Sequence, residues 1–89
     1  MRAVITVVGK DKVGILAKVS SVCAENNINI IEVSQSILRE MFCMIMLVET
    51  ADNEKSFMAF SDNLKKEGEK QGLVIHAMHE DIFDSMHRI

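Results

Sequence analysis

The stretch VITVVGKDKVGILAKVSSVCAENNINIIEVSQS, residues 4–36, decides the fold. Its first part is rich in β-branched residues and ends at Gly9, which predicts a strand over residues 2–8. Apolar residues then recur three and four positions apart, and this spacing places them on one side of a helix that we expect over residues 12–26. The residues that carry this spacing are Ile15, Leu16, Val19, Val22 and Cys23.

The remaining segments alternate between strand and helix patterns. The asparagines of NNIN break the first helix, because Asn tolerates turn and left-handed conformations. A second strand is expected at 28–38, a third at 41–49 after a polar turn, a long helix within 51–72, a fourth strand at 73–80 and a short helical piece at 81–89. Asp11 and Asp81 stand where the N-caps of the first helix and of this last piece are expected.

This order of elements, βαββαβ, predicts an α+β protein with the ferredoxin-like fold, in one domain spanning 1–89. The sheet is expected to be four-stranded and antiparallel, with two helices on one face and a short C-terminal helical segment. Residues 3–8 and 41–48 are apolar on nearly both faces, so the first and third strands should be central and the more polar second and fourth strands should be edges.

Two helices cover only one face of such a sheet, so apolar side chains on the other face need a different cover. Val4 and Val8 are candidates for that face, together with one of two alternating sets in the third strand. The two sets are Phe42, Met44, Met46 and Val48, or Cys43, Ile45 and Leu47. A second subunit or the C-terminal segment is the expected cover, which predicts a homo-oligomer and most simply a homodimer.

Composition excludes several classes of function. The net charge is −3 and the pI is near 5.5, and basic residues form no stripe, so neither nucleic acid nor a membrane surface is an expected partner. The longest apolar stretch, Met41–Val48, is far shorter than the roughly 20 residues that span a bilayer. Two cysteines, Cys23 and Cys43, are too few for a disulfide framework, and we expect a cytoplasmic protein with reduced thiols.

The loop GKDKVGIL, residues 9–16, has glycines five positions apart after a strand but lacks phosphate-binding chemistry. A phosphate loop requires Lys and Ser or Thr directly after its second glycine, and here Ile15 and Leu16 follow Gly14. The dinucleotide pattern requires a glycine where Asp11 stands. No nucleotide cofactor is therefore expected.

The same loop resembles that of the ACT domain, a small module that binds amino acids and similar ligands and regulates metabolic enzymes. The resemblance rests on an Asp in the turn, a Gly before Ile, and an Asn-Ile pair that opens the second strand: Asp11, Gly14, Ile15, Asn29 and Ile30. Through GKDKVGI, SQSIL and the tail DIFDSMHRI the chain is similar to the short stand-alone ACT proteins of bacteria and archaea. It departs from the family at Val13, where proline is common.

This resemblance implies a ligand site between the first loop and the start of the second strand, commonly at a subunit interface. First-turn N–H groups suit a carboxylate, and a nearby acid or amide suits an ammonium group. We expect the two segments to converge, because Asn29 begins the strand next to the one that Gly9 ends and a dimer can bring a second copy of either element close. The predicted ligand residues are Lys10, Asp11, Lys12, Val13, Gly14, Ile15, Asn29 and Ile30. Equally, Asp11 is explained as a cap, Gly14 as a packing residue and Asn29 as a turn residue.

The interpretation is thus a regulatory module that senses an amino acid or similar metabolite and acts on a separate partner protein, without enzymatic activity. The alternative is a small enzyme or metal-handling protein that uses a C-terminal cluster of histidines and acids: His76, His79, His87, Glu80, Asp81 and Asp84. Three-residue spacing on a strand sends His76 and His79 to opposite faces, which favours the first interpretation and predicts no metal site.

Overall fold

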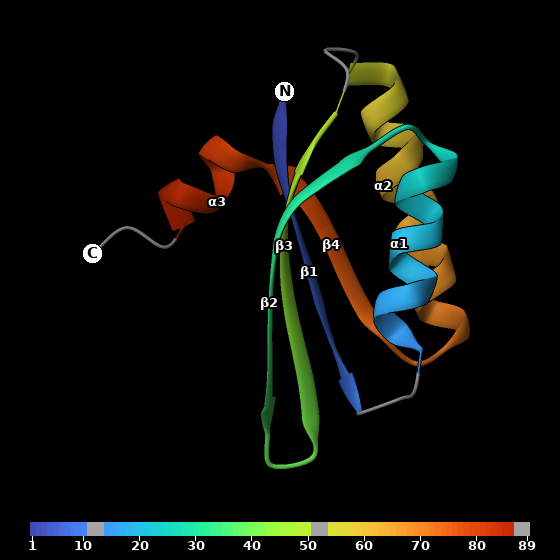
Figure 1. The fold of residues 1–89 in the computed structure, drawn as a ribbon, viewed down its shortest axis with the longest axis vertical. Coiled ribbons are helices and arrows are strands. Elements are labelled where there is room, and N and C mark those ends of the chain that lie inside the picture. The colour runs from blue at the N-terminus through green and yellow to red at the C-terminus, as the bar shows by residue number, and fades with distance from the viewer. Residues whose placement is uncertain (11–13, 51–53, 87–89) are drawn as a thin grey trace.

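A computed structural model describes residues 1–10, 14–50 and 54–86. The order of elements is that expected from the sequence, with a short third helix after the last strand (Figure 1). The elements are β1 (Arg2–Lys10), α1 (Ile15–Glu25), β2 (Asn29–Leu38), β3 (Met41–Glu49), α2 (Glu54–Lys70), β4 (Val74–His79) and α3 (Glu80–Met86).

The four strands form one antiparallel sheet in the order β2-β3-β1-β4, which confirms the ferredoxin-like prediction. β1 and β3 are central and β2 and β4 are edges, as their compositions predicted. Helices α1 and α2 lie together on one side of the sheet (Figure 1). Every residue of β2 after Ile31 is exposed, so this long strand bounds the sheet almost without cover.

Helix α1 begins later than its spacing predicted, at Ile15 rather than at residue 12. Gly14 occupies the N-cap position with φ 86°, a left-handed conformation that ends the preceding loop. The prediction that Asp11 is the cap is therefore wrong about the capping position, and Asp11 itself lies outside the described residues. At the other end Asn26 donates from Nδ2 to the carbonyl oxygen of Val22 over 2.8 Å, and Asn27 adopts φ 56°.

Two further boundaries differ from the sequence prediction. β1 continues two residues past residue 8 to Lys10, because its pairing with β3 extends to Met41. Helix α3 begins at Glu80, so Asp81 lies in its first turn and is not its N-cap. The carboxylate still stands at the end of the helix where negative charge is favourable.

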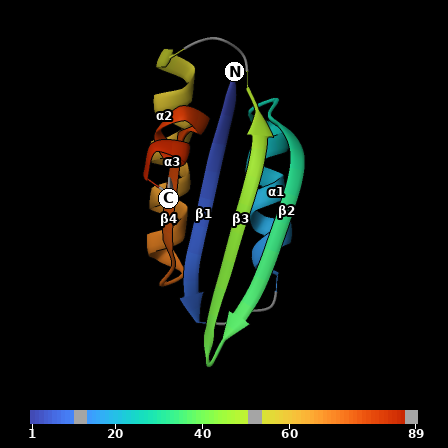
Figure 2. The same ribbon diagram turned by 90° about the vertical axis from the view of Figure 1, so that its left-hand side faces the viewer.

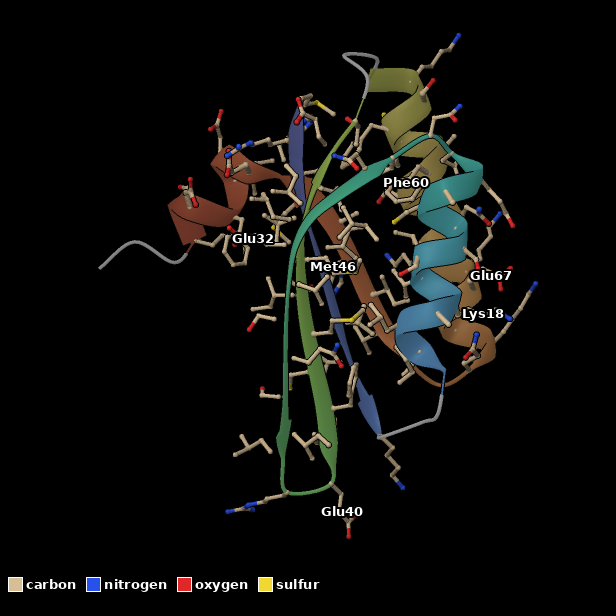
Figure 3. All side chains as sticks on the ribbon, in the orientation of Figure 1. Lys18, Glu32, Glu40, Met46, Phe60 and Glu67 are labelled. Atoms are coloured by element: carbon tan, nitrogen blue, oxygen red, sulfur yellow. The ribbon has the colours of Figure 1, made fainter. Side chains whose placement is uncertain are left out.

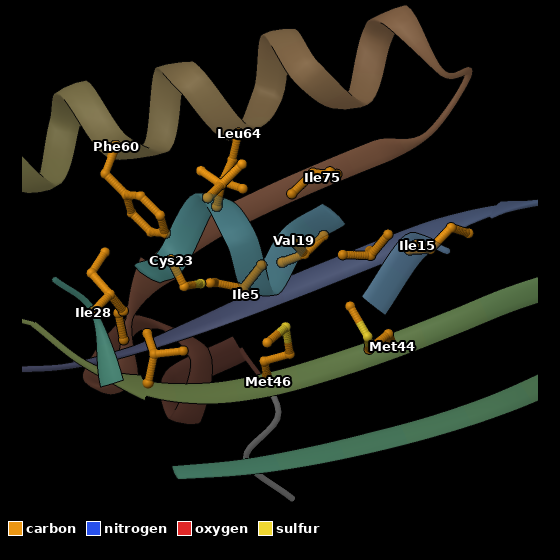
Figure 4. Close-up of a cluster of buried hydrophobic side chains, with 14 of the residues drawn as sticks. Ile5, Ile15, Val19, Cys23, Ile28, Met44, Met46, Phe60, Leu64 and Ile75 are labelled. Carbon is orange, nitrogen blue, oxygen red and sulfur yellow. The ribbon is translucent and has the colours of Figure 1, made fainter. Parts of the chain in front are cut away.

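The core lies between the sheet and the two long helices, where Ile5, Met46 and Phe60 are among the fully buried side chains (Figure 4). Burial of one such side chain stabilises the folded state by about 1.5–3 kcal/mol. Met46 and Phe60 point into this layer, while Lys18 and Glu67 lie on the outer side of the helices (Figure 3). No polar or charged side chain is buried among the residues described.

The strand register decides which set of β3 side chains faces the helices. Phe42, Met44, Met46 and Val48 lie in the core, so Cys43, Ile45 and Leu47 point to the opposite face. That face, which carries neither α1 nor α2, is called the helix-free face from here on (Figure 2). Val4 and Val8 belong to it, as the sequence predicted.

Helix α3 covers part of the helix-free face. It contacts β1 and β4 and lies in front of β4 in the view of Figure 2. Val4 is only 4% exposed although it lies outside the main core, which is consistent with cover by α3. The C-terminal segment is thus one of the two expected covers, and it leaves much of the face open.

Candidate ligand site

Gly14 gives the start of α1 an open backbone. Apart from its two chain neighbours, no residue that the structure describes has a heavy atom within 4 Å of the position a Cβ would take, and Gly14 is exposed. The carbonyl of Gly14 accepts the first hydrogen bond of the helix, from the N–H of Lys18 over 2.9 Å. The N–H groups of the first turn have no acceptor within the helix, so they point toward the space beside Gly14.

The charge at this end of α1 suits an anion. The first turn of α1 carries no acidic side chain, so no carboxylate from the turn itself competes for its N–H groups. Lys10 is exposed at the end of β1, directly before the loop. A cation and a positive helix end on either side of one loop form a setting in which a ligand carboxylate is stabilised.

The predicted loop residues are placed in part. Ile15 is buried in the core as the first residue of α1, so its backbone rather than its side chain faces the loop. Asp11, Lys12 and Val13 lie outside the described residues. Their part in the site therefore stays a prediction.

The second half of the predicted site is far from the first within one chain. Asn29 pairs with Glu49, which pairs with Arg2 at the beginning of β1, whereas Lys10 pairs with Met41 at the other end of the sheet. Strand β3 also lies between β1 and β2. The expectation that Asn29 begins the strand next to β1 and converges with its loop is therefore wrong for a single chain.

Asn29 and Ile30 differ in environment. Asn29 is exposed at the first position of β2, whereas Ile30 is half-buried and packs against the core. A register shift follows Ile30, and the ladder resumes at Glu32. Such a bulge re-aims the side chains around it, so the amide of Asn29 is presented to solvent at the edge of the sheet.

The two cysteines are free and lie in different environments. Burial raises the pKa of the Cys23 thiol from 9.0 to about 11, because the thiolate would lose its hydration in the core. Cys43 is half-buried on the helix-free face. Cys23 therefore does not offer the activated thiolate that nucleophilic catalysis requires, since burial holds it in its neutral form.

The C-terminal histidines do not assemble a metal site in the described part of the chain. His76 pairs with Thr6 on the helix-free face, and His79 pairs with Ala3 on the helix side, so the prediction of opposite faces is confirmed. The ring of His79 lies against Phe57, with centroids 5.0 Å apart. Across residues 1–10, 14–50 and 54–86 no group of three or more His, Cys, Asp or Glu could hold a metal ion, and His87 lies outside them.

A groove that the sequence did not reveal lies between α2, β4 and α3. It has a volume of about 280 Å³, with Phe57 and His79 beside Met58, Met78 and Ile82. Its residues come from segments about twenty positions apart, and no local spacing links them.

Over the described part of the chain, none of the helices combines the length and the apolar character needed to cross a membrane.

Comparison with known proteins gives a consistent result. A sequence model described as the ACT domain matches residues 2–78. A UPF0237 protein of Clostridium perfringens is 49% identical over 89 residues, which is the whole of both chains. Among solved structures, an ACT domain protein from Streptococcus pneumoniae is 38% identical and aligns with a TM-score of 0.81 over 98% of each chain.

A more distant structure shares the fold alone. A formyltetrahydrofolate deformylase from Pseudomonas putida is 16% identical and aligns with a TM-score of 0.74, covering 88% of this chain and 28% of that one. The match of the family model over most of the chain, together with the close relatives of equal length, assigns the chain. It belongs to the ACT domain family, whose members are regulatory modules that bind small molecules.

Proposed function

We propose that this protein is a non-catalytic sensor that binds an amino acid or a similar metabolite as a homodimer and transmits its occupancy to a separate partner protein. Membership of the ACT family supports the regulatory class. The free cysteines support a cytoplasmic location, where thiols are kept reduced.

The observation that carries this proposal is the open start of α1 at Gly14. A carboxylate placed beside Gly14 would accept hydrogen bonds from the first-turn N–H groups, because no side chain occupies that space in the described structure. A residue with a Cβ is strained at φ 86°, and glycine at this position leaves the first-turn N–H groups without a side chain of residue 14 beside them. Asp11 in the adjoining loop is the proposed partner of the ligand ammonium.

The homodimer follows from the separation of the two predicted segments. Lys10 and Asn29 stand at opposite ends of the sheet in one chain, so a ligand of amino-acid size contacts both segments only if they come from different subunits. We therefore assign Lys10, Asp11, Lys12, Val13, Gly14 and Ile15 to one subunit and Asn29 and Ile30 to the other. In this arrangement a homodimer holds two equivalent sites.

A thermal-shift screen of the natural amino acids, followed by calorimetric titration of the best compound, tests the proposal. Asp11→Ser should weaken binding by about tenfold or more, because a charged hydrogen bond is worth about 1.5–3 kcal/mol. Asn29→Ala should weaken it as well. Asp62→Ser and Asn63→Ala make the same exchanges at exposed positions of α2 and should leave affinity unchanged.

Two results would overturn the proposal. One is the absence of any amino-acid-dependent shift. The other is a stoichiometric metal in the purified protein together with activity that depends on it, which would favour the C-terminal cluster instead. If binding occurs but Asp11→Ser and Asp62→Ser bind equally well, the sensor stands and its site lies elsewhere.

A further inference from the structure

One end of the helix-free face remains open to solvent. Val8 pairs with Val74, and both are exposed, by 37% and 56%. Lys10 pairs with Met41, which pairs with Leu38. Exposed large apolar side chains from all four strands therefore form a contiguous surface, which we call the open patch: Val8, Leu38, Met41, Ile45 and Val74.

The two ends of the helix-free face differ in charge. Lys10 flanks the open patch, and the strand residues of this face contribute no acid there. Arg39 and Glu40, in the neighbouring turn, offset one another. The other end is acidic despite Arg2, whose guanidinium lies 3.8 Å from Glu80. Its acidic residues are Glu32 and Glu49 on the strands and Glu80, Asp81 and Asp84 on α3.

Helix α3 offers a surface complementary to the open patch. None of its residues is fully buried, and its apolar residues Ile82 and Met86 are about half and 64% exposed. These two residues are four positions apart and so share one side of the helix. Three of the seven residues of α3 are acidic, and none is basic. Apolar side chains with negative neighbours suit an apolar patch with a lysine, Lys10, at its rim.

The position of α3 determines how a second sheet approaches this face. Two sheets that stack directly lie about 10 Å apart. A helix with its side chains is about 10–12 Å across, so α3 occupies the space in which a second sheet would otherwise pack directly on this one. Figure 2 shows α3 toward one end of the face and the sheet uncovered beyond it. A second copy must therefore rest on α3, and the space beside the helix must be filled by something of equal thickness.

We propose that two copies of this chain associate through their helix-free faces, so that α3 of each copy packs on the open patch of the other. A two-fold axis perpendicular to the strands exchanges the ends of the face. It sets the acidic α3 of one copy over Val8, Val74 and the Lys10 rim of its partner, and the reverse contact is identical. An axis parallel to the strands would instead set the acidic ends together, which like charge disfavours.

A second copy is the occupant because one chain carries both complementary surfaces. The inference rests on the homodimer of the proposed function and adds its interface. It also gives α3 a second role beside the cover of Val4, since a helix with no buried residue leaves most of its own surface free for a partner. In the dimer the two α3 helices form the layer between the two sheets.

Sedimentation velocity of the ligand-free full chain, over a range of concentrations at low salt, tests the interface. Asp84→Lys and Lys10→Glu should each raise the dimer dissociation constant by about tenfold, and the double variant should return it to within about threefold of wild type. Val74→Glu should prevent association. Glu69→Lys makes the same change of charge on exposed α2 and should have no effect. Circular dichroism should show that each variant is folded.

The outcomes separate this inference from the function it extends. A wild-type chain that remains monomeric at every concentration would overturn both the interface and the proposed homodimer. Ligand binding by the single chain would still be tested separately by calorimetric titration. A dimer that is unaffected by Asp84→Lys and Val74→Glu would overturn the interface alone. A double variant no better than its single variants would show that Lys10 and Asp84 do not face one another, which contradicts the exchanged ends.

Discussion

Lys10 and Asn29 mark opposite ends of the same sheet: Lys10 pairs with Met41 at the tip of the β2–β3 hairpin, and Asn29 pairs with Glu49 beside the start of β1. The two strands run in the same direction with β3 between them. The first loop and the opening of β2 are therefore separated by the length of α1. Any ligand that touches both segments requires two chains.

Mixing two defective variants tests this requirement. Homodimers of Asp11→Ser or of Asn29→Ala have no intact site if each site combines a loop from one subunit and an Asn29 from the other. After subunit exchange the mixed dimer regains one intact site, so about one quarter of all sites should bind with wild-type affinity. Calorimetric stoichiometry measures this fraction. A mixture that binds no better than either variant alone would place both residues in one subunit's site, or in none.

Gly14→Ala should destabilise the protein by about 1–2 kcal/mol, because a side chain with Cβ is strained in the left-handed conformation. The described residues do not crowd the added Cβ, since none of them apart from the two chain neighbours has a heavy atom within 4 Å of it. Gly14→Asn should cost less, as Asn adopts this conformation more readily. Denaturant unfolding of both variants gives the comparison. Equal losses for Ala and Asn would argue against backbone strain at this position.

Met44 and Ile45 are adjacent in β3 but face opposite sides of the sheet, and they are 1% and 45% exposed. Met44→Ala should lower the free energy of unfolding by about 2–5 kcal/mol through the cavity it leaves in the core. Ile45→Ala should change it by less than about 1 kcal/mol when measured at a concentration where the chain is monomeric. Urea unfolding provides the measurement. A larger loss at Ile45 than at Met44 would reverse the assigned register of β3.

The two thiols should react at different rates. Burial holds the pKa of Cys23 at about 11, so at pH 8 only about one thiol in a thousand is ionised, and the core also shields it. Cys43 is half-buried and should be alkylated first by iodoacetamide. Mass spectrometry of partially labelled protein identifies the site. In strong denaturant both cysteines should react alike, and preferential labelling of Cys23 in the native protein would contradict its burial.

The same thiol should make stability depend on alkaline pH. In the unfolded chain Cys23 ionises near its ordinary pKa of 9.0, whereas in the folded chain it keeps its proton up to about 11. The contribution of the neutral Cys23 thiol to the free energy of unfolding is therefore complete below about pH 9. It declines as the pH rises toward 11, because over this range the unfolded state binds fewer protons than the folded state. Comparison with Cys23→Ala isolates this effect. The difference in unfolding free energy between the two proteins should narrow over this range.

Residue patterns predicted most of the fold, because the apolar or polar character of each residue largely determines whether that residue is buried. The apolar composition of β1 and β3 identified them as central, and the polar residues of β2 and β4 placed those strands at the edges. Which alternating set of β3 faces the helices stayed open, since Met44 and Ile45 are both apolar. The choice depends on pairing with β1, and that register is a property of the assembled sheet.

The candidate site was predicted less well, for two physical reasons. The spacing of apolar residues predicted a helix from residue 12, but the left-handed backbone at Gly14 prevents α1 from beginning before Ile15. Residue spacing does not report backbone conformation. The place of Asn29 depends on the insertion of β3 between β1 and β2, a long-range arrangement that local residue types do not encode. Asn26, by contrast, ends α1 through its own side chain, so its role was readable.

The uncovered edge of β2 has a consequence for how the chain behaves in a crowded cell. Along β2, Asn29–Leu38, the backbone donors and acceptors that do not pair with β3 face outward at the sheet margin, and Glu32 is the single charged residue of the strand. A strand of this kind is a template on which another extended chain can grow, and charge is the usual deterrent. At high concentration or on partial unfolding, the carboxylate of Glu32 and the bulge after Ile30 are therefore the features of β2 that oppose edge-to-edge association.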